Sequence, residues 1–434
     1  MQLTPQQQAL LDGAQGETMA KVVKTLVMYG DTFGAQRMVP VTSEYGHTVI
    51  SFGLAVMKPV YDLYDRLIEA GLTSGQKFTA DPRPLDKNVP TSLLEDIVFR
   101  KIMYTQQARY EEQLRKLGIT ADDGYTCTCY LEQVGNQPRK GDILSWAESS
   151  AVVYANSVLG ARCNRNSGML ELMGSIAGFV PEFGLLTDEG RKAHWLIEVK
   201  CQSRPEPQLL GSAIGMKVME DVPYVRGLDT WLGTELNDEN RAYLKDFGAA
   251  TASNGAVGLY HIENLTPEAR EQGEALLHEG FQTYVIDDAE LERVKRSYPV
   301  IWKDPAARPE LCFVGCPHLT LEQLHQYPYA AFTQSDTNLN YAEEVVVGTA
   351  ADFNQVVYVS DRATIYSVIA HTNCVSTGSG GLPEGFGDDR LVTVPLTGQH
   401  DMRLGYIKLC SVPLSESGRE FVDILRQILR ELEG

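Results

Sequence analysis

Apolar residues recur at helical spacing through the first third of the chain. Thr4 and Gln7 form the pattern of a capped helix start, and apolar positions continue at intervals of three and four, with a break at Gly13. The same spacing predicts helices over residues 54–70 and 91–117. A glycine follows each of these two segments, as expected where a helix ends in a left-handed conformation.

Further along the chain, short β-type runs alternate with helical segments. A short strand is expected at residues 38–41 and a longer one at residues 194–200. Strands are also predicted at residues 310–316, 343–348, 355–359 and 391–395, with helices that start at Thr320 or cover residues 361–373 and 415–432. Because strands alternate with helices, the predicted fold class is α/β, with mainly parallel sheets covered by helices on both faces.

The chain of 434 residues is longer than a single hydrophobic core usually supports. Its pattern changes near Pro309, so we expect an N-terminal α/β region over residues 1–308 and a C-terminal α/β subdomain over residues 309–434. The sequence contains no internal repeat or low-complexity tract that would suggest a different organisation.

A formal net charge of −19 at pH 7 argues against binding to nucleic acid or to anionic membranes, because both require basic surfaces. It does not exclude a small anionic substrate, since a local pair such as Arg162 and Arg165 can dominate the potential of a pocket. The sequence has no apolar run long enough to span a bilayer and no secretory signal pattern. Together with eight cysteines in a long chain, this predicts reduced thiols and a cytoplasmic location.

Residues 125–168 contain the densest run of candidate site residues. Polar side chains there alternate with small residues in a segment that fits a helix. Burying polar groups unpaired costs free energy, so the pattern predicts a lined pocket in which two arginines grip a carboxylate or phosphate and the other residues orient the substrate. For the serines, packing with bonds to the preceding helical turn is an alternative. The predicted substrate-binding residues are Glu148, Ser149, Ser150, Asn156, Ser157, Arg162, Asn164 and Arg165.

Other polar or glycine-rich positions have ordinary structural explanations. For His47, a hydrogen-bonded core histidine is the favoured interpretation and a site histidine is the alternative. Asn254 and His261 could face a pocket. Gly211 and Gly215 could hold an anion with backbone N–H groups, or they could form a turn before a helix.

Three thiols in predicted loops, far apart in the sequence, are candidate metal ligands. Cys316 ends a predicted strand and precedes a helix start, where the helix dipole favours a thiolate. Cys374 enters a glycine-rich loop, and Cys127 lies in a short polar segment. Thiolates that converge in space suit an iron–sulfur cluster, whereas buried packing thiols are the simpler explanation from the residues alone. Zinc is disfavoured, because no tetrahedral Cys/His pattern is present.

Seven segments follow one another in a recognisable order. They are TCTCYL from residue 126, GN.P..GD from 135, WAESSAVVYANSVLGARCNR from 146, GSAIG from 211, SNGAVGLYH from 253, GCPHLTLEQL from 315 and TNC from 372. Together they resemble the aconitase X family of iron–sulfur dehydratases, and the resemblance covers nearly the whole chain. It implies an aconitase-like fold of three-layer α/β subdomains. It also implies an iron–sulfur cluster, of open nuclearity, held by Cys127, Cys316 and Cys374.

Two further thiols fall inside these motifs. Cys129 stands where relatives often have proline, and Cys163 stands where they often have threonine, so the resemblance leaves the ligand assignment partly open. A redox role for Cys127 and Cys129 as a disulfide pair is disfavoured, because a separation of one residue strains the bond.

The resemblance implies a hydro-lyase reaction, in which a base removes a carbon-bound proton and an iron site binds the departing hydroxyl as a Lewis acid. Two substrate classes are implied by the family. We place cis-3-hydroxy-L-proline first, and mevalonate 5-phosphate is the alternative. A cluster-free binding or scaffold subunit is the alternative of another class.

Family members combine this large unit with a small swivelling domain, either fused or separate, that supplies a catalytic serine. The last predicted helix runs to the end of the sequence and leaves no segment for that domain, so a heterodimer with a separate small subunit is expected. The proton-handling base is then expected on the small subunit, and no catalytic residue is assigned on this chain.

Overall fold

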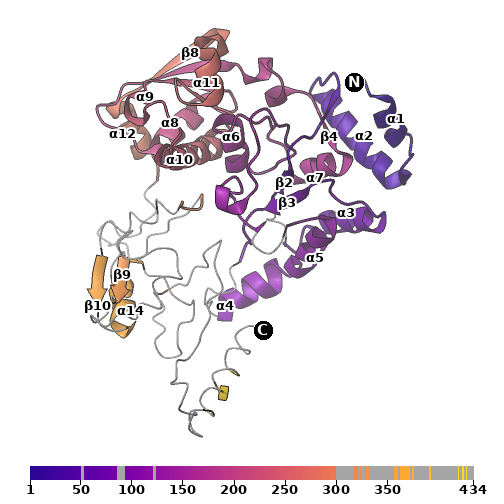
Figure 1. Cartoon of the computed structure of the whole chain (residues 1–434), viewed down its shortest axis with the longest axis horizontal. Coiled ribbons are helices and arrows are strands. Elements are labelled where there is room, and N and C mark those ends of the chain that lie inside the picture. The colour runs from indigo at the N-terminus through magenta and orange to yellow at the C-terminus, as the bar shows by residue number, and fades with distance from the viewer. Residues whose placement is uncertain are drawn as a thin grey trace, which may run out of the picture.

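The computed structural model describes most of the first 299 residues and shorter stretches of the remainder (Figure 1). The described residues are 1–49, 53–85, 93–120, 124–299, 317–320, 323, 329–332, 356–359, 362–371, 374–375, 391, 419, 423–424 and 427.

The N-terminal helices begin as the sequence predicts. In α1 (Pro5–Leu11), the backbone N–H of Gln7 donates to Thr4 Oγ1, and the backbone N–H of Thr4 donates to Gln7 Oε1. The chain turns at Gly13, which has a positive φ, and continues as α2 (Gly16–Thr32). The predicted cap and break are therefore confirmed.

The helix predicted over residues 54–70 is present in shorter form as α3 (Lys58–Glu69). The single helix predicted over residues 91–117 is wrong, because that segment is divided into three pieces. They are α4 (Leu93–Glu95), the π-helix η1 (Asp96–Met103) and α5 (Gln107–Leu117). Helix α5 ends as predicted at Gly118, whose φ is 117°.

Two pairs of short strands join the N-terminal helices. β1 (Met38–Pro40) pairs with β4 (Phe179–Pro181) in antiparallel fashion. β2 (Tyr45–Thr48) pairs with β3 (Lys77–Ala80) in parallel, with His47 opposite Thr79. The predicted strand at residues 38–41 is thus confirmed as β1.

A four-stranded parallel sheet organises the second part of the described chain, which Figure 1 shows at upper left. Its order is β7-β6-β5-β8, and every neighbouring pair is parallel. The strands are β5 (Ala193–Val199), β6 (Pro223–Arg226), β7 (His261–Ile262) and β8 (Leu277–Ile286). The strand predicted at residues 194–200 is confirmed as β5, and the predicted α/β class with a parallel sheet is confirmed as well.

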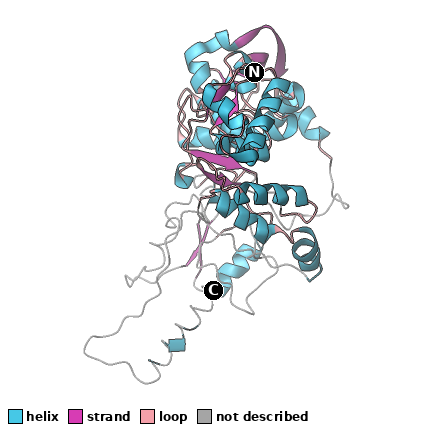
Figure 2. Cartoon of the chain, turned by 90° about the vertical axis from the view of Figure 1, so that its right-hand side faces the viewer, coloured by secondary structure: helices cyan, strands magenta, loops and turns pink. Residues whose placement is uncertain are grey.

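Helices surround this sheet, and Figure 2 shows helices predominating around the short strands. They are α8 (Pro207–Val218), α9 (Asp229–Leu232), α10 (Asp238–Gly255), α11 (Pro267–Gln272) and α12 (Asp288–Ser297). The helices that precede the sheet are α6 (Ser149–Ser157) and α7 (Gly168–Ala177). Single turns of 3-10 helix are η3 (Glu132–Val134), η4 (Gly184–Leu186), η5 (Glu189–Arg191) and η6 (Gly273–Leu276). The main apolar core joins α6, α8 and α10 to the sheet.

Glycines allow α8 and α10 to pack closely. A Cβ atom on Gly211 would lie 2.5 Å from Phe247 O, and one on Gly215 would lie 2.7 Å from Thr251 O. Both glycines are buried inside α8. The alternatives of an anion cradle or a turn at these residues are therefore wrong, because their N–H groups belong to a packed helix.

Three elements are described after residue 300. β9 (Tyr329–Phe332) and β10 (Val356–Val359) pair in parallel, and α14 (Arg362–His371) follows. The predicted strand at 355–359 and helix at 361–373 are confirmed. Thr320 and Gln323 exchange the hydrogen bonds of a capping box, as expected at the predicted helix start. The strands predicted at residues 310–316 and 343–348, and nearly all of the predicted elements at 391–395 and 415–432, lie outside the described residues.

Candidate functional site

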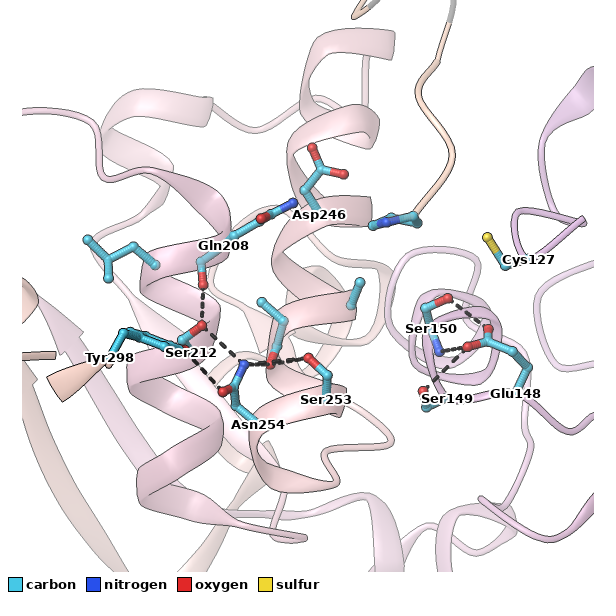
Figure 3. Close-up of a pocket in the computed structure, with 14 residues that line it drawn as sticks. Cys127, Glu148, Ser149, Ser150, Gln208, Ser212, Asp246, Ser253, Asn254 and Tyr298 are labelled. Carbon is cyan, nitrogen blue, oxygen red and sulfur yellow. Dashed lines mark hydrogen bonds between the residues drawn. The ribbon is translucent and has the colours of Figure 1, made fainter. Parts of the chain in front are cut away.

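A cavity of about 480 Å³ lies between the N-terminus of α6 and the facing surfaces of α8 and α10 (Figure 3). The first turn of α6, where the sequence pattern predicted a pocket, thus faces polar side chains of α8 and α10 across the cavity. The cavity is lined by Cys127, Glu148, Ser149, Ser150, Gln208, Leu209, Ser212, Asp246, Ala249, Ala250, Ser253, Asn254, Tyr298 and Pro317.

Glu148 caps α6 from within the cavity wall. Its carboxylate accepts hydrogen bonds from the backbone N–H groups of Ser150, at 2.9 Å, and Ala151, at 2.5 Å, and from Ser150 Oγ at 2.7 Å. Its φ of 109° is a left-handed conformation that non-glycine residues rarely adopt, which is typical of functional sites. Burial raises the pKa of the Glu148 carboxyl, and the nearby Asp81 raises it further.

A chain of hydrogen bonds forms the opposite wall. Asn254 Nδ2 donates to Ser212 Oγ at 3.1 Å, and Ser212 Oγ donates to Gln208 O at 2.7 Å. Tyr298 Oη donates to Asn254 Oδ1 at 3.1 Å. These contacts hold Asn254 at the cavity, as the sequence suggested, whereas the linear pattern gave no indication of Ser212 or Tyr298.

Asp246 is the second carboxylate of the lining. Its Oδ1 lies 2.6 Å from Lys245 Nζ, and its Oδ2 accepts from Gln323 Nε2 at 2.5 Å. Lys245 is only 2% exposed, so this cation is buried against its partner. The sequence did not single out either residue.

Two of the three predicted cysteine segments meet at this cavity. Cys127 lines it together with Pro317, which directly follows Cys316. Thr126 Oγ1 lies 3.1 Å from His318 Nδ1, which fastens the two segments to each other. Cys316 itself lies outside the described residues. Cys374 is buried in an apolar cluster with Ile365.

The two extra thiols are buried behind the cavity. Cys129 and Cys163 are both 0% exposed, and both belong to the main apolar core. Burial raises the pKa of the Cys163 thiol well above its usual value, so this thiol stays protonated. Cys163 Sγ lies 3.5 Å from Trp146 O and 3.3 Å from Asn164 O. This packing favours a structural role for Cys163.

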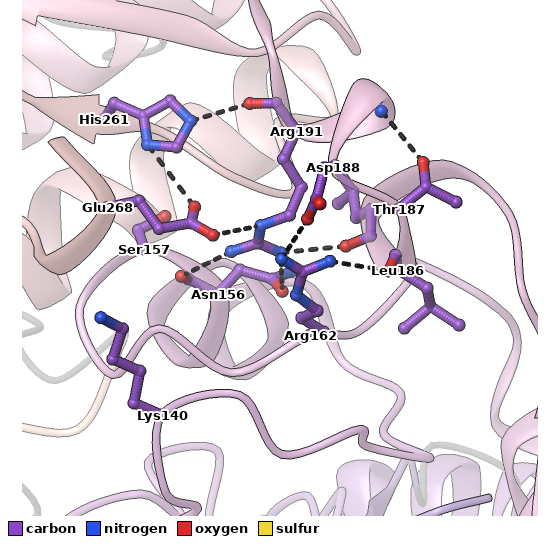
Figure 4. Close-up of polar contacts among 12 residues, drawn as sticks. Lys140, Asn156, Ser157, Arg162, Leu186, Thr187, Asp188, Arg191, His261 and Glu268 are labelled. Carbon is purple, nitrogen blue, oxygen red and sulfur yellow. Dashed lines mark hydrogen bonds and ion pairs between the residues drawn. The ribbon is translucent and has the colours of Figure 1, made fainter. Parts of the chain in front are cut away.

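Five predicted substrate-binding residues do not line the cavity, and for four of them the described contacts are internal. Asn156 Nδ2 donates to Cys163 O and Gly258 O, both at 2.8 Å, while its Oδ1 accepts from Cys163 N. Ser157 Oγ accepts from Tyr260 N, and Asn164 binds Phe183 O and Leu185 N. Arg162 donates to Leu186 O and pairs with Asp188 (Figure 4). Asn156, Ser157, Arg162 and Asn164 thus hold the fold together around the cavity.

Arg165 has a different environment from these four residues. Its side chain is exposed and passes close to Gly258. A Cβ atom added to Gly258 would lie 3.0 Å from Arg165 Cδ. Desolvation lowers the pKa of Arg165, and the nearby Glu148 and Glu220 act in the opposite direction. Arg165 is not among the residues that line the cavity, and its contact with a substrate stays a prediction.

A buried ion pair fixes the region behind α6 (Figure 4). Arg191 Nε donates to Glu268 Oε1 at 2.8 Å, and Arg191 Nη1 donates to Asn156 Oδ1 at 3.1 Å. His261 Nε2 lies 2.8 Å from Arg191 O, and burial lowers the pKa of His261 to about 4. His261 is therefore a neutral core histidine, and the suggestion that it faces a pocket is wrong.

His47 and Asp81 lie next to Glu148. His47 Nδ1 lies 2.8 Å from Thr79 Oγ1, as expected for a core histidine, while its Nε2 lies 3.3 Å from Asp81 Oδ1. A ring nitrogen of His47 and one carboxylate oxygen each of Asp81 and Glu148 all lie within 4.8 Å of one another. The sequence gave no sign of Asp81, because 34 residues separate it from His47 and only the pairing of β2 with β3 brings them together.

In the described part of the chain, no helix is both long enough and apolar enough to cross a bilayer. The cytoplasmic location stays a prediction.

Comparison with known proteins identifies the family. Profiles described as Aconitase X first domain and Aconitase X second domain match residues 1–189 and 193–296. The crystal structure of Thermococcus kodakaraensis aconitase X in its holo form is 27% identical, with a TM-score of 0.61 over 84% of this chain and 89% of that chain. The predicted boundary near residue 309 stays a prediction.

Relatives with curated names are dehydratases. The chain is 32% identical over 330 residues to the phosphomevalonate dehydratase large subunit of Thermococcus kodakarensis, which covers 75% of this chain and 76% of that protein. It is 26% identical over 334 residues to the cis-3-hydroxy-L-proline dehydratase of Hypocrea jecorina, which covers 75% of this chain and 52% of that protein. The predicted family and enzyme class are therefore confirmed, and the chain belongs to the aconitase X family of dehydratases, which are hydro-lyases.

Proposed function

We propose that this chain is the large subunit of a dehydratase that acts on cis-3-hydroxy-L-proline. The observation that carries this choice is the charge of the cavity wall. Its described lining contains two carboxylates, Glu148 and Asp246, and no lysine or arginine. The buried cation Lys245 is paired with Asp246.

A ring ammonium group suits this wall better than a phosphate does. A cation beside a carboxylate is stabilised, whereas the described lining offers a phosphate dianion no cationic side chain, because Lys245 is already paired with Asp246. The carboxylate of the amino acid would have to lie away from Glu148 and Asp246. Arg165, which lies near Glu148 but is not part of the described lining, would be the partner on this chain for that end of the substrate.

Mevalonate 5-phosphate is the second candidate substrate, and the relatives favour it. Phosphomevalonate dehydratase large subunits from Thermococcus kodakarensis and Methanocaldococcus jannaschii are both 32% identical to this chain. The hydroxyproline dehydratase of Pseudomonas aeruginosa is 26% identical. On this proposal, cationic side chains for the phosphate would have to come from residues beyond the described lining or from a partner.

The donor chemistry fits an iron–sulfur cluster held by Cys127, Cys316 and Cys374. Thiolates are the usual ligands of such clusters, and Cys127 opens onto the cavity beside the segment that contains Cys316. When bound, the cluster would supply a Lewis acid for the departing hydroxyl. The convergence of two thiol segments supports the proposal. Cys374 packs in a separate apolar cluster with Ile365 of α14, so its part in the ligand set rests on the family resemblance.

The described residues of this chain would bind and orient the substrate. Ser149 and Ser150 present hydroxyl groups at the first turn of α6, and Asn254 and Ser212 present an amide and a hydroxyl from the facing wall. The Glu148 carboxyl, with its raised pKa, would hold a proton more readily than an exposed glutamate does. These groups enclose a volume that suits a small hydroxy acid.

We expect a small swivelling-domain subunit as partner, and this subunit would contribute the proton-abstracting base. Support comes from relatives that are themselves named large subunits. The hydroxyproline dehydratases are longer, since the match covers 52% of their length, as expected if their small domain is fused.

The test is to purify the chain together with its small subunit under anaerobic conditions and to assay both compounds. Formation of a pyrroline carboxylate from cis-3-hydroxy-L-proline supports the first proposal, and formation of an anhydromevalonate phosphate supports the second. A colourless, iron-free protein that dehydrates neither compound would instead support a binding or scaffold role.

A further inference from the structure

His47, Asp81 and Glu148 form a cluster, here called the His47 cluster, and the thiol of Cys129 lies beside His47. His47 lies on β2, Asp81 follows β3, and Glu148 precedes α6. Backbone hydrogen bonds fix all three positions, because Asp81 N donates to Thr48 O and Ala147 N donates to His47 O. The carboxyl ends of two parallel strands thus meet the N-terminus of a helix, which is where open α/β folds place ligands.

Two buried polar atoms in the cluster lack a well-aligned hydrogen bond within the described structure. They are His47 Nε2 and Asp81 Oδ1, which approach each other to 3.3 Å. The side chain of His47 is 0% exposed. Unsatisfied buried groups of this kind cost free energy and call for an ordered partner.

The charge of the cluster indicates what that partner is. Two carboxylates converge there, and burial together with the proximity of Asp81 already raises the pKa of Glu148. Like charges so close resist joint ionisation unless a cation lies between them. A divalent cation would balance both carboxylates and give His47 Nε2 a ligand bond in addition to its 3.3 Å approach to Asp81 Oδ1.

The second ring nitrogen of His47, Nδ1, has a hydrogen-bond partner, as the second nitrogen of a metal-binding histidine usually does. Thr79 Oγ1 lies 2.8 Å from His47 Nδ1, and Asn136 Nδ2 donates to the same hydroxyl at 2.8 Å. Asn136 also donates to Gly46 O at 2.9 Å, so the supporting group is itself fixed. Such outer contacts orient a ligating imidazole and leave its other nitrogen free for the metal.

We propose that His47 Nε2, Asp81 and Glu148 bind one divalent cation, separate from the thiolate site. One nitrogen and two carboxylate donors suit Mn²⁺, Fe²⁺ or Zn²⁺, and not a soft thiophilic ion. Bonds of about 2.1 Å place adjacent ligand atoms roughly 3.0–3.4 Å apart, which agrees with the 3.3 Å between His47 Nε2 and Asp81 Oδ1. Because Glu148 lines the cavity, the cation would lie at its wall.

The test uses Mn²⁺ as the probe and the full chain with its small subunit. Free Mn²⁺ is measured by electron paramagnetic resonance, and electron spin echo modulation detects a histidine nitrogen bound to the ion. We expect one site with a ¹⁴N signal. We also expect at least about tenfold weaker binding in Asp81→Asn and loss of the ¹⁴N signal in His47→Gln.

Matched controls separate this inference from the proposed dehydratase activity. Asp246→Asn removes a carboxylate across the cavity and should leave Mn²⁺ binding unchanged, as should Cys127→Ser, which is expected to lose the iron–sulfur cluster. If wild-type protein binds no Mn²⁺, or binds it without a ¹⁴N signal, the proposal is overturned without recourse to any variant. Equal binding by folded Asp81→Asn, verified by its melting temperature, would overturn it as well.

Discussion

Thr126 Oγ1 lies 3.1 Å from His318 Nδ1, although 192 positions separate the two residues. The same hydroxyl lies 3.2 Å from the backbone N of Thr128, so it is held from both sides. Burial lowers the pKa of His318, and the nearby Lys245 lowers it further, so the imidazole is neutral at pH 7. This contact fastens the segment after Cys316 beside Cys127.

Replacement of Cys127 by serine should therefore remove the iron centre. A serine hydroxyl is a poor substitute for a thiolate ligand, so Cys127→Ser is expected to lose most of its iron, sulfide and visible absorbance, together with activity. Iron and sulfide analysis after anaerobic purification provides the measurement. Cys201→Ser is the matched control, because Cys201 Sγ lies near Ile286 O outside the cavity. Full iron retention in Cys127→Ser would disprove the ligand assignment.

The sequence predicted those helix ends that depend on the side chains of neighbouring residues. The capping box at Thr4 and the end of α5 at Gly118 depend on neighbouring residues, and both were correctly predicted. The break of residues 91–117 into separate helices was missed, because spacing of three to four residues does not distinguish an α-helix from a π-helical segment.

The candidate site was predictable only where the motif itself faces the cavity. Glu148, Ser149 and Ser150 line it, because they form the first turn of α6. Asn156 has the same polar character, but it faces backbone groups at Cys163 and Gly258. A sequence cannot show which backbone groups a buried amide will meet, since those partners are fixed by tertiary packing.

Gly215→Ala should destabilise the chain. A Cβ there would lie 2.7 Å from Thr251 O, closer than real Cβ atoms come, so α8 and α10 would have to separate. We expect a loss of about 1–3 kcal/mol in the free energy of unfolding, despite the better helix propensity of alanine. Met216→Ala is the control, because Met216 is exposed on the same helix and should change stability by less than about 0.5 kcal/mol. Urea unfolding of both variants measures the difference, and equal midpoints would contradict the close packing.

Arg191→Met should destabilise the chain more strongly. Its removal leaves Glu268 buried without its cation and breaks the contact with Asn156, so a loss of about 3–5 kcal/mol is expected. The same substitution at Arg37, which pairs with Glu182 at the surface, should cost no more than about 1 kcal/mol. Thermal unfolding under identical conditions compares the two variants. A similar small effect at both positions would mean that the buried pair contributes little.

Glu171 makes stability depend on pH. Burial raises its pKa to about 8 from the ordinary 4.5, even though hydrogen bonds from Asn166 and Ser145 act to lower it. The folded chain therefore keeps this proton at pH values where the unfolded chain has released it. The free energy of unfolding is therefore highest, as far as Glu171 is concerned, below pH 4.5. It falls as pH rises from 4.5 to about 8, and above pH 8 the loss stays constant.

Glu171→Gln should remove this penalty, because glutamine is neutral and can still accept from Asn166 Nδ2. We expect the variant to be more stable than wild type by about 2–4 kcal/mol at pH 8.5 and equal to it within about 0.5 kcal/mol at pH 5. Urea unfolding at pH 5, 7 and 8.5 gives the two curves. Glu112→Gln is the control, because Glu112 is exposed on α5 and its replacement should not produce a difference that grows with pH. Parallel curves for wild type and Glu171→Gln would show that Glu171 ionises normally in the folded protein.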